Sequence, residues 1–196
     1  MIALTEEISL RYSPAGHIFL SQQAEIFLHG ENRKSILFTS DLGNLITEDE
    51  HIFVENFVPV KKANIVIGEC TYAAKDREMT RKNVDTDFRK LESVIRQYCV
   101  DAANRVLIPT FALDRMPYML WMLYTIFGRD EKFDVPILVD SPLAIRLLEH
   151  YAVLLEGKAK ESFREMMEWK NIKLIVTPEE SKAAIDSKRS CVVLSS

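Results

Sequence analysis

The chain has 196 residues, of which 47% are hydrophobic and 28% charged, and its formal net charge at pH 7 is −4. This composition excludes a disordered tail and is sufficient for one large domain or two small ones. The acidic balance excludes the overall positive charge that marks many nucleic-acid-binding proteins, so any RNA binding would use a local patch or a metal-lined groove.

Four short strands are predicted in the first part of the chain, at residues 8–12, 24–28, 35–39 and 65–68, from runs of β-type residues. Gly30, Glu31 and Asn32 predict the turn between the second and third strands. Beyond Glu69 the pattern changes to alternating helices and strands.

The first helix of this second part is predicted over residues 85–98, because its apolar residues, including Tyr98, recur at spacings of three and four. A second helix follows Asp114, a predicted N-cap, and ends at Gly128, with Pro117 in its first turn. This helix is apolar on nearly all sides, which predicts burial. The other predicted elements are strands 105–108, 137–139, 173–176 and 191–194, helices 143–155 and 159–169, and a short helix from Ser181.

Strand–helix alternation predicts a mostly parallel sheet flanked by helices. The carboxyl ends of such strands meet at one edge, which brings together residues 109–111, 140–142, 177–179 and 195–196. Two interpretations stay open for this edge. It is a binding surface, or residues such as Thr110, Asp140 and Thr177 are turn and N-cap residues.

The cysteines Cys70, Cys99 and Cys191 form no Cys-x-x-Cys pair. Their number and spacing are typical of reduced, mostly buried thiols, so we expect a cytoplasmic protein. No apolar run approaches about 18 residues and the first residues lack the features of a signal peptide, so we expect no membrane partner.

His17 and Asp41 are metal-capable side chains beside predicted strand ends. Imidazole and carboxylate suit Zn²⁺, Mn²⁺ or Fe, although two ligands do not complete a site; the alternative is a hydrogen-bonded loop histidine and a turn aspartate. Glu69 ends the strand 65–68 and is either a solvated strand end or a group that orients a histidine or a proton shuttle. We expect His17, Asp41 and Glu69 on one edge, with His17 and Asp41 close enough to share an ion and Glu69 beyond the direct ligands. Shared burial of two acids without a cation is costly, and a bound metal would relieve that cost.

Six short segments stand in a fixed order along the chain: Ala15-Gly16-His17-Ile18 with Ser21, Ser40-Asp41-Leu42-Gly43, Glu69-Cys70-Thr71-Tyr72, residues 108–115 (IPTFALDR), residues 139–144 (VDSPLA) and residues 192–196 (VVLSS). Together they resemble the landmarks of the β-CASP proteins, a family of metallo-β-lactamase-fold nucleases that process RNA.

The resemblance implies an α/β fold in two parts: residues 1–70 as part of a metallo-β-lactamase αββα sandwich, and residues 71–196 as a β-CASP cap with a mostly parallel sheet and the start of the return to the first domain. It implies that His17 is a metal ligand, that Asp41 bridges two zinc ions, with Mn²⁺ as an alternative metal, and that Asp41 and Glu69 are catalytic. The implied partner is single-stranded RNA threaded between the two domains.

The chain departs from the family in lacking the His-x-His-x-Asp-His loop, since its other histidines, His29, His51 and His150, are scattered. Smaller departures are Leu20, Ser40 and Ala73. The sequence also stops at Ser196, where the family continues, so we expect an internal segment of a longer protein or a truncated gene product.

Three functions remain open. The favoured one is part of a metal-dependent ribonuclease-type phosphodiesterase, inactive as this chain alone. The second is a non-catalytic scaffold that binds RNA or protein, and the third is a hydrolase of small esters or thioesters. Homo-oligomers or association with a missing domain are further expectations.

Overall fold

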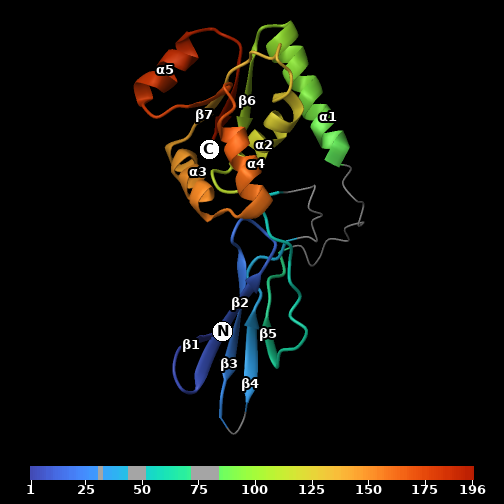
Figure 1. Cartoon of the computed structure of the whole chain (residues 1–196), viewed down its shortest axis with the longest axis vertical. Coiled ribbons are helices and arrows are strands. Elements are labelled where there is room, and N and C mark those ends of the chain that lie inside the picture. The colour runs from blue at the N-terminus through green and yellow to red at the C-terminus, as the bar shows by residue number, and fades with distance from the viewer. Residues whose placement is uncertain (31–32, 44–51, 72–83) are drawn as a thin grey trace. The chain divides into compact units, whose positions relative to one another are not determined.

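The computed structural model describes residues 1–30, 33–43, 52–71 and 84–196 (Figure 1). The chain forms two compact units, Met1–Thr80 (unit 1) and Arg81–Ser196 (unit 2). The domain boundary predicted between residues 70 and 71 stays a prediction. Glu31 and Asn32 of the predicted turn lie outside the described residues, as do His51, Tyr72 and Ala73.

Unit 1 contains a five-stranded sheet with the strand order β1-β2-β3-β4-β5 (Figure 1). Neighbouring strands are antiparallel except β4 and β5, which run parallel. The four predicted strands are present, and β1 is too short to leave a pattern in the sequence. The strands are β1 (Ile2–Ala3), β2 (Ile8–Pro14), β3 (Gln22–Leu28), β4 (Lys34–Phe38) and β5 (Ile65–Ile67).

Two buried polar side chains of unit 1, Glu25 and Gln23, make hydrogen bonds within the sheet and to a neighbouring segment. Glu25 on β3 is 1% exposed and accepts hydrogen bonds from Arg11 Nε at 2.7 Å and Nη2 at 3.0 Å, across the strand pair β2–β3. The Arg11 guanidinium also lies 5.3 Å from the centre of the Phe27 ring. Gln23 donates to the carbonyls of Pro14 and Val58, which attaches the segment around residue 58 to the sheet. Glu25 and Gln23 therefore each have partners that offset their desolvation.

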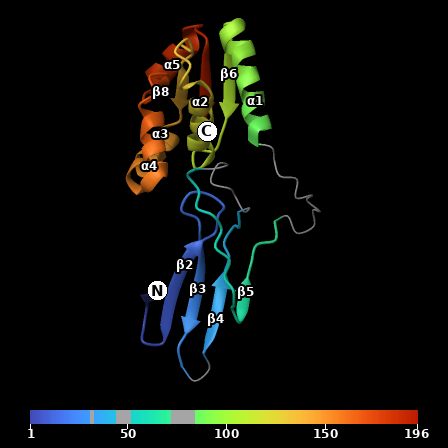
Figure 2. The ribbon, with the colours of Figure 1, turned by 45° about the vertical axis from the view of Figure 1, so that its right-hand side comes forward.

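Unit 2 contains a four-stranded sheet with the order β6-β9-β7-β8, and all its strand pairs are parallel. The prediction of a parallel sheet flanked by helices is confirmed, and Figure 2 shows α1 on one side of the strands and α3 and α4 on the other. The strands are β6 (Arg105–Pro109), β7 (Ile137–Asp140), β8 (Ile172–Leu174) and β9 (Cys191–Ser195). The helices are α1 (Val84–Ile95), the π-helix η1 (Arg96–Asp101), α2 (Arg115–Phe127), α3 (Pro142–Leu154), α4 (Gly157–Met167) and α5 (Pro178–Asp186).

Helix α2 is buried on several sides, as its all-round apolar sequence predicts. Met116, Leu120, Leu123 and Phe127 have no exposed surface, and Phe127 stacks on Phe133 with ring centres 4.1 Å apart. One expectation for this helix is wrong: Asp114 occupies the N-cap position, but its side chain makes no capping hydrogen bond. Its φ of 65° is left-handed rather than extended, so the carboxylate is not directed at the first-turn amides.

The helix predicted over residues 85–98 is not one regular helix. Helix α1 ends at Ile95 and the chain continues as the π-helix η1. Because a π turn holds more residues than an α turn, the buried face moves along the sequence. Tyr98, expected on the buried face, is 46% exposed, while Cys99 is 2% exposed. Across the described parts of the chain, no helix has both the length and the apolar character needed to cross a bilayer.

Candidate functional site

His17, Asp41 and Glu69 all belong to unit 1, and each stands just beyond a strand. His17 lies in the turn between β2 and β3, Asp41 follows β4, and Glu69 follows β5. Strands β4 and β5 are parallel, and their pairing extends past the strands because the Thr39 amide donates to the Ile67 carbonyl at 3.0 Å. Both carboxylates therefore leave the sheet at the same edge, as the sequence predicts.

The loop that carries His17 is in direct contact with the loop that carries Asp41. The Gly43 amide donates to the Ala15 carbonyl at 2.9 Å. A Cβ atom on Gly43 would lie 1.5 Å from the Gly16 oxygen, and a Cβ on Gly16, whose φ is +69°, would lie 2.7 Å from the Phe57 nitrogen. Glycine at position 43 therefore allows the two loops to approach each other, and glycine at position 16 allows the His17 loop to lie against Phe57.

Glu69 uses both carboxylate oxygens to hold backbone amides. One oxygen accepts from the Leu42 amide at 3.3 Å, and the other accepts from the Thr71 amide at 3.0 Å. The hydrogen bonds from Thr71, then the one from Leu42, and the nearby charge of His17 keep the pKa of Glu69 below its ordinary value. Glu69 therefore links the residue after Asp41 to the end of β5 and interacts electrostatically with His17.

Two hydroxyl side chains complete this network of loop contacts. Ser21 accepts from the amides of His17 at 3.0 Å and Ile18 at 3.2 Å, which fixes the turn that presents the histidine. Thr39, which is 6% exposed, accepts from the Glu69 amide at 3.3 Å and donates to the Ser40 carbonyl at 2.9 Å. The role of Thr39 was not predicted from the sequence. The sequence pattern that could have indicated this role is a threonine at a strand end, because its hydroxyl can hydrogen-bond neighbouring backbone groups.

The two acids are not buried together, so the cost of shared burial does not arise in this structure. His17, Asp41 and Glu69 are all exposed, because they stand on loops at the end of the sheet. Asp41 and Glu69 line one pocket of about 330 Å³ with Thr39 and Ser40. Water reaches both carboxylates in this structure, so their repulsion is screened and does not itself require a cation.

His17 and Asp41 match zinc in ligand type but not in number. Among the residues that the structure describes, no group of three or more His, Cys, Asp and Glu side chains is placed to hold a metal ion. Catalytic zinc sites use at least three protein ligands. A shared ion between His17 and Asp41 therefore stays a prediction that depends on ligands beyond these.

The carboxyl edge of unit 2, formed by the residues that follow β6, β9, β7 and β8, brings together the predicted loops. The Thr110 amide donates to the Ser195 carbonyl at 2.8 Å, the Ser141 and Ser196 hydroxyls share a hydrogen bond, and Ser181 donates to Asp140 at 2.7 Å. Some of these residues have structural roles. Ser141 is the N-cap of α3, and Thr177 forms a capping box at the start of α5.

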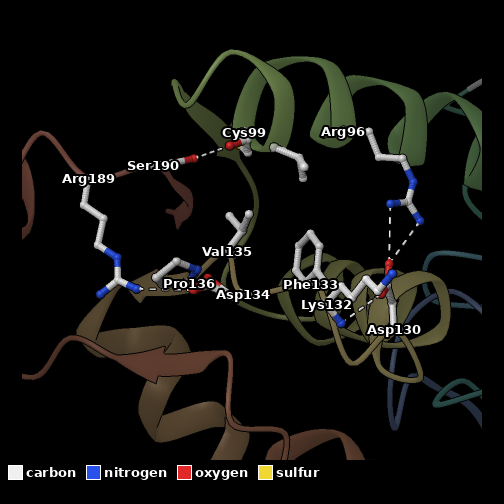
Figure 3. A pocket seen from close by; sticks show the side chains of 11 residues that line it. Arg96, Cys99, Asp130, Lys132, Phe133, Asp134, Val135, Pro136, Arg189 and Ser190 are labelled. Carbon is white, nitrogen blue, oxygen red and sulfur yellow. Dashed lines mark hydrogen bonds and ion pairs between the residues drawn. The ribbon is translucent and has the colours of Figure 1, made fainter.

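A separate pocket of about 440 Å³ lies at the opposite, amino end of these strands (Figure 3). Its lining includes Arg96, Lys132 and Arg189. Asp130 lies 3.4 Å from Arg96 Nη2, and Asp134 lies 4.0 Å from Arg189 Nη2. Two of the three cations thus face carboxylates, and we assign this pocket no function.

Comparisons with known proteins bear on both units. A family model described as the Beta-Casp domain matches residues 117–196. Ribonuclease TTHA0252 of Thermus thermophilus is 30% identical over 193 residues, which cover 95% of this chain and 42% of that protein. An Integrator complex subunit 11 homolog of Dictyostelium discoideum is 28% identical over 88% of this chain and 22% of its own length. Endoribonuclease YSH1 of Gibberella zeae is 27% identical over 79% of this chain and 18% of its own length. The chain thus spans less than half the length of these curated relatives.

Proposed function

Because the chain belongs to the β-CASP family of metallo-β-lactamase-fold proteins, we propose that it is a segment of a metal-dependent phosphodiesterase that hydrolyses RNA. The observation that carries the proposal is the contact between three loops of unit 1. The His17 loop touches the Asp41 loop through Gly43 and Ala15, and Glu69 holds the amide of Leu42. The names of the ribonuclease and endoribonuclease relatives favour RNA as the substrate.

In this proposal His17 and Asp41 are two ligands of a larger metal site, and Zn²⁺ is the expected ion, with Mn²⁺ as an alternative. Two bound metal ions would lower the pKa of a water molecule and stabilise the charge that develops on the phosphate. Glu69 and Ser21 orient the loops that carry the ligands, because both bind backbone amides beside them. The remaining ligands would come from a His-x-His-x-Asp-His loop, which this sequence does not contain.

The first test uses the 196-residue chain itself. With labelled single-stranded RNA and Zn²⁺ or Mn²⁺ it should show no hydrolysis above a control with chelator, because two ligands hold metal weakly and leave water unactivated. Robust turnover that His17→Ala abolishes would contradict this expectation and would mean that the chain holds further ligands.

The second test uses the coding sequence upstream of Met1. A His-x-His-x-Asp-His loop there, and RNA hydrolysis by the extended protein, would support the proposal. Asp41→Asn and His17→Ala should then reduce hydrolysis by at least 100-fold, whereas His150→Ala, which removes an exposed histidine on α3, should leave it unchanged. Hydrolysis that survives both ligand substitutions would refute the roles of His17 and Asp41.

A non-catalytic scaffold that binds RNA or protein is the second candidate. It is favoured by the lack, among the described residues, of a three-ligand group for a metal. Absence of the histidine loop from the parent gene would select this candidate. For either candidate we also propose that the bound RNA is single-stranded, that the protein is cytoplasmic and that it self-associates.

A further inference from the structure

The carboxyl edge of unit 2 exposes apolar side chains in a row that follows the order of the strands. Phe111 after β6 is 78% exposed, Leu143 after β7 is 52% exposed, and Val176 after β8 is 65% exposed. Between β6 and β7 in the sheet lies β9, which ends in Ser195 and is followed by Ser196. Apolar side chains and hydroxyls therefore share the edge at which open parallel sheets bind ligands.

Phe111 has the largest exposed fraction among the large apolar residues of this edge, although its backbone is firmly held. The Thr110 amide donates to the Ser195 carbonyl at 2.8 Å, and the Phe111 carbonyl accepts from the Met116 amide at 3.1 Å. Both anchors belong to the ordered sheet and to α2. The ring is thus presented to solvent by a fixed loop, which lowers the entropy lost when a ligand stacks on it.

The neighbours of Phe111 suit the backbone of a nucleic acid. The side chain of Arg115, in the first turn of α2, is 71% exposed, and its contact with Asp114 is long at 3.9 Å. Asp114 itself is buried, whereas the Arg115 guanidinium reaches solvent and can engage a phosphate. Thr110 and Ser196 carry hydroxyls along the same edge, whereas the Ser141 hydroxyl is buried as the N-cap of α3. An aromatic platform beside a cation and hydroxyls is the arrangement that binds unpaired nucleotides.

We propose that Phe111 is a stacking platform for one base of a single-stranded RNA at the carboxyl edge of unit 2. The inference rests on the proposed function for its ligand class, and it adds the residue that distinguishes unpaired from paired RNA. A base in a duplex is already stacked on its neighbours and does not offer its face to Phe111. Arg115 would contact the adjoining phosphate.

The test measures RNA binding by the full chain in chelator, so that hydrolysis plays no part. Fluorescence anisotropy with a labelled oligo(A) should give a dissociation constant about tenfold higher for Phe111→Ala, equal to the loss of about 1.4 kcal/mol of stacking. The control is Leu107→Ala, which removes an apolar side chain that is 65% exposed on β6, before that strand reaches its carboxyl end at Pro109. This control should bind as the unchanged protein does.

A second variant gives a direct spectroscopic signal. In Phe111→Trp the new indole should be quenched by oligo(A), and an abasic oligomer of equal length should leave its fluorescence unchanged. Phe111→Ala should also keep the melting temperature, because the ring is exposed.

Three outcomes would overturn the inference. If Phe111→Ala binds as tightly as Leu107→Ala, Phe111 is not a platform and the proposed function is unaffected. A lower melting temperature for Phe111→Ala would mean that the ring packs against the chain itself. If the unchanged chain binds no single-stranded RNA, this inference falls, whereas RNA as the substrate is decided separately by the hydrolysis test on the extended protein.

Discussion

Replacement of Gly43 by alanine tests the contact between the His17 and Asp41 loops most directly. The added Cβ would lie 1.5 Å from the Gly16 oxygen and 2.0 Å from the Gly16 carbonyl carbon. Both are backbone atoms, so no change of rotamer relieves the overlap. Since contacts under 3.0 Å essentially never occur for a Cβ, the loops must separate by about 1.5 Å.

That separation would break the hydrogen bond from Gly43 to Ala15, now 2.9 Å long. Overpacking typically costs about 1–3 kcal/mol and a lost hydrogen bond about 1 kcal/mol, so we expect Gly43→Ala to destabilise unit 1 by about 3 kcal/mol. Amide hydrogen exchange in β2 to β4 measures this loss. Both tryptophans, Trp121 and Trp169, lie in unit 2, so their fluorescence should report an unchanged unfolding transition there.

The matched control is Gly30→Ala, because a Cβ at Gly30 would meet no atom within 4 Å. Its effect on unit 1 should stay within about 0.5 kcal/mol, as for surface substitutions in general. The reasoning would be refuted if Gly43→Ala were as stable as this control and left the amide chemical shifts of residues 15–17 unchanged. The two loops would then not be in contact.

Two further predictions concern paired or hydrogen-bonded charges. In urea unfolding of unit 1, Arg11→Gln should lower the free energy of unfolding by about 3 kcal/mol, because it leaves the buried Glu25 carboxylate unpaired. Glu25→Gln should lower it by only about 1 kcal/mol, because the remaining arginine is 50% exposed. Equal costs for the two substitutions would contradict the pairing. Glu180 accepts hydrogen bonds from the amides of Val176 and Thr177, which lower the pKa of its carboxyl group. The ionised carboxylate therefore stabilises the start of α5 at pH values above its pKa in the unfolded chain, and this stabilisation is lost as the pH falls through its pKa in the folded chain. The protection factors of these two amides, which correct for the slower intrinsic exchange in acid, should therefore fall as the pH is lowered. Glu180→Gln should remove this pH dependence of the protection. A dependence that survives the substitution would assign it to another group.

Much of the fold follows from local sequence patterns. Strand–helix alternation was enough to predict the parallel sheet of unit 2, because crossover helices cover both faces of such a sheet. The end of α2 at Gly128 was also predictable, although the reason differs from the usual left-handed cap. Gly128 has a helical φ of −62°, and a Cβ there would lie 2.5 Å from the Tyr124 oxygen. The glycine in the sequence therefore predicts where α2 ends, and the close approach of Tyr124 explains why glycine is needed there.

The errors arise where backbone geometry departs from the regular period. The π-helix η1 moves Cys99 into the core and leaves Tyr98 exposed, since the 3.6-residue repeat does not hold there. Asp114 has the residue type of an N-cap but the wrong φ, a conformation set by the tight turn before α2. Residue type and spacing do not report either departure.

For the candidate site, the sequence by itself determined which residues stand at strand ends: His17, Asp41 and Glu69 follow β2, β4 and β5 because short apolar runs stop just before them. Only the tertiary structure decided that these ends meet. Three contacts join segments that are far apart in the chain: the parallel pairing of β4 with β5, the close approach of Gly43 to Gly16, and the hydrogen bond from the Glu69 amide to the buried Thr39 hydroxyl. A local pattern encodes the conformation of its own segment, whereas the distance between two segments depends on how the whole sheet packs.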